Sequence, residues 1–215
     1  MRLPFSIEEF LGVFRAYNLT VWPAQIALYL LGIALVVMAI RGSGAWRRWS
    51  VAGALALLWG WMGAAYHLTF FAEINPAAWV FGVMFLVQAV LWIAWAWREP
   101  SMSFWPADDM LRFTGAGLLG YAFVIYPVLN FTFGHGYPAM PTFGLPCPTT
   151  IATFGILAWA KPRPPWYIWL IPVAWAVIGT SAAFTLGIHE DLGLLAAAVL
   201  TIAMHMRSEW RRERL

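Results

Sequence analysis

Seven long runs of apolar residues, separated by short polar segments, dominate this amino-acid sequence. A helix needs about 20 apolar residues to cross the hydrocarbon core of a bilayer. Charged residues make up only 11% of the chain, against about 25% in soluble domains. The sequence therefore predicts an all-α integral membrane protein, a seven-helix bundle built as one domain over residues 1–215. The predicted spans cover residues 20–40, 49–71, 77–97, 114–133, 147–160, 166–187 and 190–206.

The basic residues alternate with these runs and predict an orientation. Eleven of the thirteen Lys and Arg residues lie in the segments 41–48, 98–112, 161–165 and 207–215. Loops on the cytoplasmic side of a membrane are enriched in Lys and Arg. The pattern predicts seven crossings with the N-terminus outside and the C-terminus inside. The three outer loops contain no basic residue and carry Glu73, Glu190 and Asp191 instead.

The N-terminal segment 1–18 has the pattern of a capped amphipathic helix. Ser6 and Glu9 form an S-x-x-E capping box, and apolar residues follow at helical spacing. Such a helix lies in the membrane interface or packs as an ordinary helix on the rest of the protein. We see no cleavable signal peptide, because no apolar region with a small-residue cleavage site is present.

An internal repeat is a further possibility. The fifth run opens "CPTTIA", similar to "WPAQIA" at the start of the first run. The sixth run ends "GTSAAFTLGIHED", comparable with "GAAYHLTFFAEIN" at the end of the second. Two three-helix units joined by the fourth run would give a 3+1+3 parallel repeat, an arrangement that some transporters use. Chance similarity between apolar segments is an equally acceptable explanation.

The stretch 134–150, "GHGYPAMPTFGLPCPTT", interrupts the apolar pattern. It contains four prolines and Cys147, the single cysteine of the chain. Irregular backbone at membrane depth is tolerated only where it is buried in protein or lines water. We therefore predict a lid folded over or into the outer mouth of the bundle, followed by a helix capped near Thr149. The first turn of that helix would be a possible anion site, or the segment would simply close the bundle.

Polar residues within the apolar runs gather toward the predicted outer end. Because polar groups at membrane depth usually face the bundle interior or a water-filled cavity, their positions predict an outward-facing polar pocket. The predicted pocket-lining residues are Gln25, Tyr66, His67, Asn130, Cys147, Thr149 and Thr180.

Three histidines share that end and suggest a divalent or soft metal as a possible cofactor. The candidate ligands are His67, His135, His189 and Glu190, because imidazole and carboxylate suit zinc, and a thiolate from Cys147 would favour softer metals. The spacing matches no H-x-x-x-H, H-E-x-x-H or C-x-x-C motif. Hydrogen bonding of the histidines to nearby carbonyls and acids is the alternative, and Cys147 is equally an inert buried thiol.

Several function classes are disfavoured. The net charge of +3 does not indicate a nucleic-acid-binding protein, because the arginines form short clusters between apolar runs rather than a basic face. One cysteine excludes an intrachain disulfide. Neither a G-x-S-x-G motif nor a P-loop is present. The expected partners are the lipid bilayer and a small solute or ion.

Three stretches in order, "VWPAQ", "LWGWMGAAYHLTFFAEINPAA" and "YPAMPTFGLPCPTTIATFGILAW", resemble a bacterial family of polytopic membrane proteins, the domain of unknown function 6064 family. The resemblance covers nearly the whole chain and implies a location in a bacterial inner membrane. It implies no activity and no site residue. The function that we expect is a small-solute or ion transporter or channel whose pocket is capped by residues 134–150. The alternatives are a membrane-embedded metal- or thiol-dependent enzyme and an accessory subunit of a membrane complex.

Overall fold

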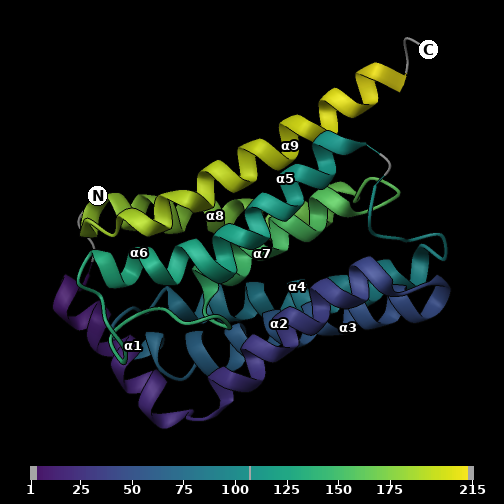
Figure 1. Ribbon diagram of the computed structural model, residues 1–215. Coiled ribbons are helices and arrows are strands. Elements are labelled where there is room, and N and C mark those ends of the chain that lie inside the picture. Colours follow the sequence, from purple (N-terminus) through teal and green to yellow (C-terminus); the bar gives the residue numbers. More distant parts are fainter. Residues whose placement is uncertain (1–3, 107, 213–215) are drawn as a thin grey trace.

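The structure of the chain, a computed structural model, describes residues 4–106 and 108–212. These residues fold into helices and contain only two isolated β-bridges, so the all-α prediction is confirmed. Figure 1 shows the arrangement. The α-helices are α1 (Ile7–Thr20), α2 (Ala24–Arg41), α3 (Gly44–Trp61), α4 (Ala78–Arg98), α5 (Asp109–Gly120), α6 (Tyr126–Thr132), α7 (Pro146–Trp159), α8 (Trp166–Leu186) and α9 (Gly193–Arg212). Short π or 3-10 segments are η1 (Met62–His67), η2 (Phe71–Glu73), η3 (Tyr121–Ile125) and η4 (His189–Leu192).

Six helical stretches of the described chain are long and apolar enough to cross a membrane. They are Ala24–Arg41, Gly44–Glu73, Ala78–Arg98, Asp109–Thr132, Trp166–Leu186 and His189–Ser208. Their outward faces carry large apolar side chains, for example Phe113 and Phe131, which are 74% and 78% exposed. Such faces are typical of helices that contact lipid. The fold is therefore compatible with a multi-pass membrane protein.

The fifth predicted span differs from the other six. It forms α7, whose 14 residues give a helix of about 21 Å, short of the roughly 30 Å hydrocarbon core. Every residue of α7 is buried, so the helix is enclosed by protein rather than by lipid. Because α7 is too short to span alone, the number of seven crossings stays a prediction.

The helices form two layers. Figure 1 shows α2, α3 and α4 in one layer and α5, α7, α8 and α9 in the other. Contacts between α4 and α8 join the layers, while α7 packs against α5, α8 and α9. The orientation in the membrane and the 3+1+3 repeat stay predictions.

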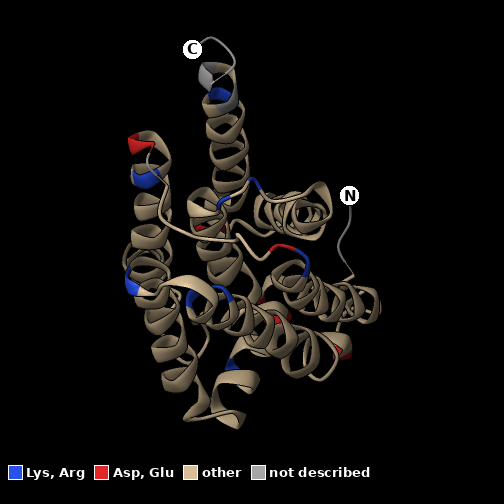
Figure 2. Ribbon diagram, turned by 90° about the vertical axis from the view of Figure 1, so that its right-hand side faces the viewer, with Lys and Arg blue, Asp and Glu red and all other residues tan. Residues whose placement is uncertain are grey.

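The two ends of the bundle have different residues. At one end, the loop after α4 pairs with the loop after α7, where the amides of Ser103 and Lys161 exchange hydrogen bonds of 2.6 and 2.7 Å with each other's carbonyls. The side chain of Arg47 joins this end by donating to the Phe104 carbonyl. Figure 2 is turned so that this end faces the viewer, with Lys and Arg in blue, and these residues are frequent in the segments 41–48, 98–112 and 161–165. We call it the basic end.

Exposed tryptophans mark both ends. Those at the basic end are Trp46, Trp97, Trp166 and Trp210, and those at the opposite end are Trp22 and Trp79, each at least 59% exposed. Trp is enriched where a membrane meets water. The two groups are therefore placed as two interfacial belts would be, one at each end of the spans.

Helix α1 packs on the end opposite the basic end. The predicted capping box is confirmed: the Glu9 amide donates to Ser6 Oγ, and the Ser6 amide donates to Glu9 Oε2. The Trp61 indole donates to the Tyr17 hydroxyl over 2.6 Å, and burial raises the pKa of Tyr17 to about 12. Figure 1 shows α1 running across the ends of the bundle helices. An interfacial position for α1 stays a prediction.

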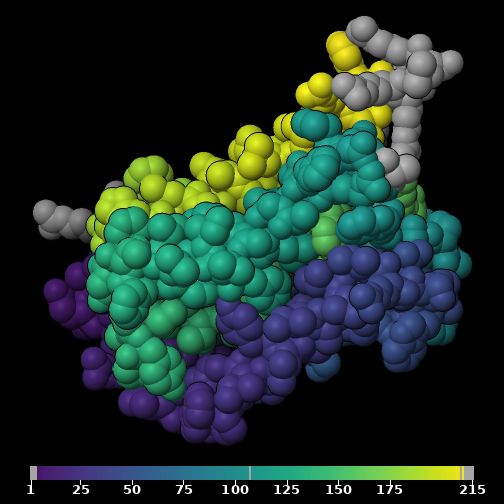
Figure 3. Space-filling view, viewed as in Figure 1, coloured from purple at the N-terminus to yellow at the C-terminus, as the bar shows by residue number. Residues whose placement is uncertain are grey.

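The Pro-rich segment 133–145 is folded into the wall of the bundle. The Asn18 amide group of α1 donates to the carbonyls of Pro138 and Met140, at 2.8 Å each. The Phe143 ring is 2% exposed and stacks on Phe123 with centroids 4.5 Å apart. Figure 3 shows the green segment between purple α1 and teal α6.

Helix α7 begins earlier than we predicted. It starts at Pro146, and its N-cap is Leu145 rather than a residue near Thr149. Pro146 and Pro148 fall in the first turn, where amide groups have no partner within the helix, so their missing N–H groups cost nothing there. Thr149 Oγ1 instead accepts from the Gly144 amide at 2.9 Å. The prolines therefore begin a helix, and the irregular backbone precedes them.

Candidate functional site

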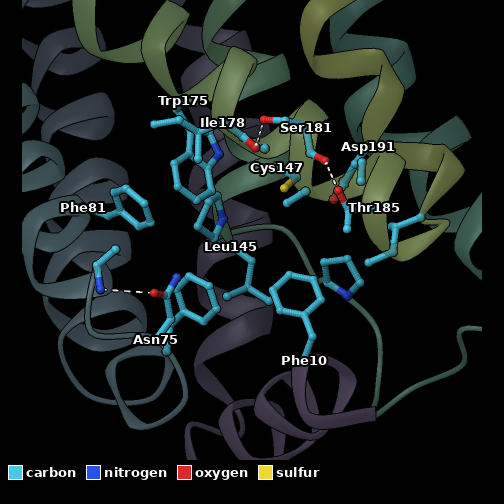
Figure 4. Close-up of a pocket in the computed structure, with 18 of the residues that line it drawn as sticks. Phe10, Asn75, Phe81, Leu145, Cys147, Trp175, Ile178, Ser181, Thr185 and Asp191 are labelled. Atoms are coloured by element: carbon cyan, nitrogen blue, oxygen red, sulfur yellow. Dashed lines mark hydrogen bonds between the residues drawn. The ribbon is translucent and has the colours of Figure 1, made fainter. Parts of the chain in front are cut away.

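A cavity of about 570 Å³ lies at the end of the bundle opposite the basic end. That volume is within the usual range of small-molecule pockets, about 300–1,000 Å³. Its wall comes from α1, η2, the start of α4, the start of α7 and one side of α8 (Figure 4). Segments from both ends of the chain therefore meet around one cavity.

Aromatic rings form most of the wall. They are Phe5, Phe10, Phe14, Tyr66, Phe71, Phe81 and Trp175. Several of them contact one another: the ring of Phe10 packs edge-on against Phe14, and Tyr66 stacks on Phe71. The opposite side, on α8, carries small residues such as Gly179, Ala182 and Ala183. The cavity is thus an apolar space lined mainly by rigid rings, with little side-chain bulk along the Gly179–Ala183 part of α8.

The cavity has a buried floor and an exposed mouth. Tyr66, Cys147 and Asp191 are each 7% exposed or less. Ala77, the N-cap residue of α4, and Ser181 of α8 also line the cavity and are exposed. Because these two helices bear lipid-facing side chains, the mouth opens sideways on the apolar surface of the bundle.

Two π segments interrupt long helices beside the cavity. Segment η1 ends the helix begun by α3 and carries Tyr66, and segment η3 precedes Tyr126. A π turn adds a residue to a helix and re-aims the side chains around it, and such turns are frequent at functional sites. Here they accompany the two tyrosines nearest to the floor of the cavity.

Asp191 lies at the floor of the cavity, and the adjacent acid Glu190 is buried outside the cavity wall. The Nδ1 atom of His135 is 2.8 Å from Glu190 Oε1. Glu190 Oε2 is buried and without a hydrogen-bond partner among the described residues. The Tyr126 hydroxyl donates to Asp191 Oδ1 over 2.5 Å. The two carboxylates are therefore held by different partners, one by a histidine and the other by a phenol.

Asp191 also lies beside the first turn of α7. The Cys147 thiol, the second residue of that helix, donates a hydrogen bond to the Asp191 carboxylate. The N-terminus of a helix stabilises nearby negative charge. The anion at this helix start is thus the protein's own carboxylate, where the sequence suggested a possible external anion.

Cys147 sits in surroundings that do not favour a thiolate. Reactive thiols are found near cations or histidine, whereas the side-chain partners of Cys147 are the Asp191 carboxylate and the Trp175 indole. The thiol therefore serves as a small apolar group and weak donor in the cavity wall.

Two of the seven predicted pocket residues, Tyr66 and Cys147, line the cavity. The other five are Gln25, His67, Asn130, Thr149 and Thr180, and they lie outside its wall. Gln25 donates to the Asn18 carbonyl at 2.6 Å, and Asn130 donates to the Tyr126 carbonyl at 2.9 Å. These two side chains hold neighbouring backbone in place.

His67 occupies a cage of aromatic rings behind the cavity wall. Its ring centroid lies 4.6 Å from that of Phe85 and 5.0 Å from that of Trp175. Both ring nitrogens are buried without a hydrogen-bond partner among the described residues. His67 therefore packs as an aromatic side chain in this structure.

The four candidate metal ligands are not brought together as one set. His135 meets Glu190, His189 packs against Phe133, and His67 lies in its aromatic cage. The described part of the chain contains no group of three or more His, Cys, Asp or Glu residues that could hold a metal ion. The proposal below therefore uses no metal.

Comparison with known protein families gives one match. The model of a family of unknown function (DUF6064) matches residues 7–214. The chain belongs to this family. Neither the curated proteins nor the solved structures contain a significant match. Membership of DUF6064 confirms the resemblance noted in the sequence and carries no activity with it.

The cavity-lining residues of this DUF6064 chain that were not predicted from the sequence are mainly aromatic. Phe10, Phe14 and Trp175 read as ordinary core positions, because helical spacing does not distinguish a cavity wall from a packed core. Asp191 carried a usable signal, since the adjacent acids of "GIHEDLGLL" stand between two apolar runs. An acid in such a setting is costly to bury and often marks a site.

Proposed function

We propose that this protein is a multi-pass membrane transporter that binds a lipophilic small molecule in the cavity between α1, α7 and α8. The observation that carries the proposal is the aromatic cavity that ends at the start of an interrupted, fully buried helix. Binding sites of many secondary transporters lie where a helix breaks within the membrane and irregular backbone lines the site. Here α7 and the segment before it supply that arrangement.

The proposed ligand is apolar over most of its length because the wall of the cavity is apolar. The sideways mouth beside Ala77 and Ser181 suggests entry from the lipid phase. A small polar solute or an ion, the expectation from the sequence, would find few partners along the rings. The proposed ligand is thus mainly apolar, whereas the polar pocket predicted from the sequence would have bound a polar solute or an ion.

We propose an inner-membrane location with the basic end toward the cytoplasm, following the positive-inside rule. The cavity then opens in the outer half of the membrane. Two C-terminal fusions test this orientation. A green fluorescent protein should fluoresce and an alkaline phosphatase should stay inactive, because both would lie in the cytoplasm. The opposite pair of results would reverse the orientation.

Ligand binding can be tested with the full chain in lipid nanodiscs and three labelled ten-carbon amphiphiles with neutral, positive and negative heads. The variant Ala182→Phe places a ring in the cavity from a lining position that is only half-buried. The matched control is Ala196→Phe, on an exposed position of α9 outside the cavity wall. At least one amphiphile should bind the wild type and the control at least tenfold more tightly than Ala182→Phe.

The same amphiphile tests transport in proteoliposomes. Its release from loaded vesicles should be faster with wild-type protein or Ala196→Phe than with Ala182→Phe. Binding without faster release would leave a binding protein and refute transport. If no amphiphile distinguishes Ala182→Phe from Ala196→Phe, the cavity is not a binding site and the proposal fails.

A further inference from the structure

Among the described residues, the wall of the cavity contains one carboxyl group, that of Asp191. Asp191 accepts hydrogen bonds from Tyr126 and Cys147, both neutral donors. Among the described residues, ion pairs join Arg112 to Asp109 and His135 to Glu190, and none involves Asp191. The carboxylate therefore meets the cavity without a cation.

His135, the histidine near the floor, pairs with the neighbouring acid Glu190. His135 is 2.8 Å from Glu190 Oε1, and Glu190 Oε2 is itself buried without a hydrogen-bond partner in the described chain. Two buried acids thus face one histidine. Because burying a charge is costly unless it is paired, a cation that entered the cavity would be stabilised at this floor.

The aromatic wall favours the same kind of ligand. Tyr66 and Trp175 line the cavity together with Cys147 and Asp191, and Figure 4 shows Trp175, Cys147 and Asp191 around the same space. Aromatic ring faces attract ammonium groups, and cages of such rings bind quaternary ammonium ligands. Rings and carboxylate together would hold a positive head, while the remaining phenylalanines cover an apolar body.

We propose that the cavity takes a molecule with a positively charged amine or quaternary ammonium head and an apolar body, with the head against Asp191. The inference rests on the proposed binding function and adds the ligand class to it. An anionic amphiphile would meet Asp191 and be repelled. A neutral one would gain only the apolar contacts. Ammonium heads occur both on membrane lipids and on free amphiphilic amines, so the shared chemistry is what we infer.

The test compares decyltrimethylammonium, 1-decanol and decanoate on the full chain in phosphatidylglycerol nanodiscs, which contain no ammonium lipid. Decyltrimethylammonium should bind at least tenfold more tightly than 1-decanol, and decanoate should bind most weakly. The variant Asp191→Asn keeps the shape of the side chain and removes the charge. It should lose at least tenfold in decyltrimethylammonium affinity and keep its affinity for 1-decanol, which also shows that the cavity is intact.

The outcomes separate this inference from the proposed function. Equal binding of the cation and 1-decanol, with no effect of Asp191→Asn, would overturn the ligand class while Ala182→Phe still blocks both. If Ala182→Phe bound all three amphiphiles as tightly as the wild type, the cavity would not be the binding site. If Asp191→Asn fails to fold, the wild-type order of the three amphiphiles decides: tightest binding by decanoate or 1-decanol would refute the proposal.

A further experiment tests whether the ammonium head belongs to a membrane lipid or to a free amine. In nanodiscs that contain phosphatidylethanolamine, a lipid ligand would compete with decyltrimethylammonium and lower its apparent affinity at least threefold. The protein would then also retain that lipid in native mass spectrometry. Unchanged affinity would point to a free amphiphilic amine. Both results support the ammonium class, and they differ only in where the ligand comes from.

Discussion

At the basic end of the bundle the charged side chains reach solvent, whereas at the cavity end charged and hydrogen-bonding side chains are buried. Arg41, Arg98 and Arg207 are exposed, while Asn18, Asn130 and Glu190 are 0% exposed. Water satisfies the first group at little cost. The second group depends on partners within the protein. The comparison teaches that folding stability depends more on single polar residues at the cavity end than at the basic end.

The largest loss of folding stability at the cavity end is expected when the histidine that pairs with Glu190 is removed. His135→Leu leaves a buried carboxylate without its partner and should reduce the free energy of unfolding by about 3–5 kcal/mol. Thermal unfolding in detergent micelles measures the loss. The double variant His135→Leu/Glu190→Gln removes the uncompensated charge and should recover most of it. Equal stability of the single and double variants would contradict the ion pair.

The next effect concerns the anchor between α1 and the Pro-rich segment. Asn18→Leu leaves the buried carbonyls of Pro138 and Met140 without their donor and should cost about 2–3 kcal/mol. Hydrogen exchange at the amides of Ala139, Met140 and Thr142 should become faster. The control Thr132→Val removes an exposed hydrogen bond and should leave both readouts unchanged. Unchanged exchange in Asn18→Leu would mean that the segment is held by other contacts.

Two glycines of the Pro-rich segment should differ in how much an alanine substitution reduces stability. Gly144 and Gly134 have φ of +96° and +85°, so alanine is strained at both. A Cβ on Gly144 would also clash with Leu28 Cδ1, whereas nothing lies within 4 Å at Gly134. Gly144→Ala should therefore reduce stability by about 1–3 kcal/mol more than Gly134→Ala, the range for overpacking. Equal denaturation midpoints would show that the segment is not packed against α2.

The smallest effect is expected at the basic end. Asp109 pairs with Arg112, and both side chains are at least 37% exposed. Such surface pairs contribute about 0–1 kcal/mol, so Asp109→Asn should change the unfolding free energy by less than about 0.5 kcal/mol. Chemical denaturation in micelles measures it. If Asp109→Asn reduced the unfolding free energy as much as His135→Leu does, the two ends would not differ in their sensitivity to substitution.

The fold was largely predictable because membrane spans are governed by length and apolarity. The predicted segments 77–97 and 166–187 agree with α4 and α8 to within one residue at each end. The same rule does not apply to α7, because its burial depends on the helices around it. No local pattern shows that a short apolar helix is enclosed by protein rather than lipid.

The candidate site was predictable only in part. Tyr66 and Cys147 were found because they are polar groups in apolar runs near one end. The aromatic wall could not be found in this way, since Phe10 and Phe14 reach the cavity only after α1 packs on η1 and η2. The π segments likewise follow from tertiary packing, and the sequence of η3, "YAFVI", contains no glycine or proline to indicate one.

The most direct measurement is a crystal structure with a decyltrimethylammonium analogue that carries bromine at the far end of its chain. Anomalous scattering locates the bromine independently of the protein density. We expect the bromine among the phenylalanine rings and the ammonium head against Asp191, with the peak lost in Ala182→Phe and kept in Ala196→Phe. A bromine peak outside the cavity, or one that persists in Ala182→Phe, would contradict the account.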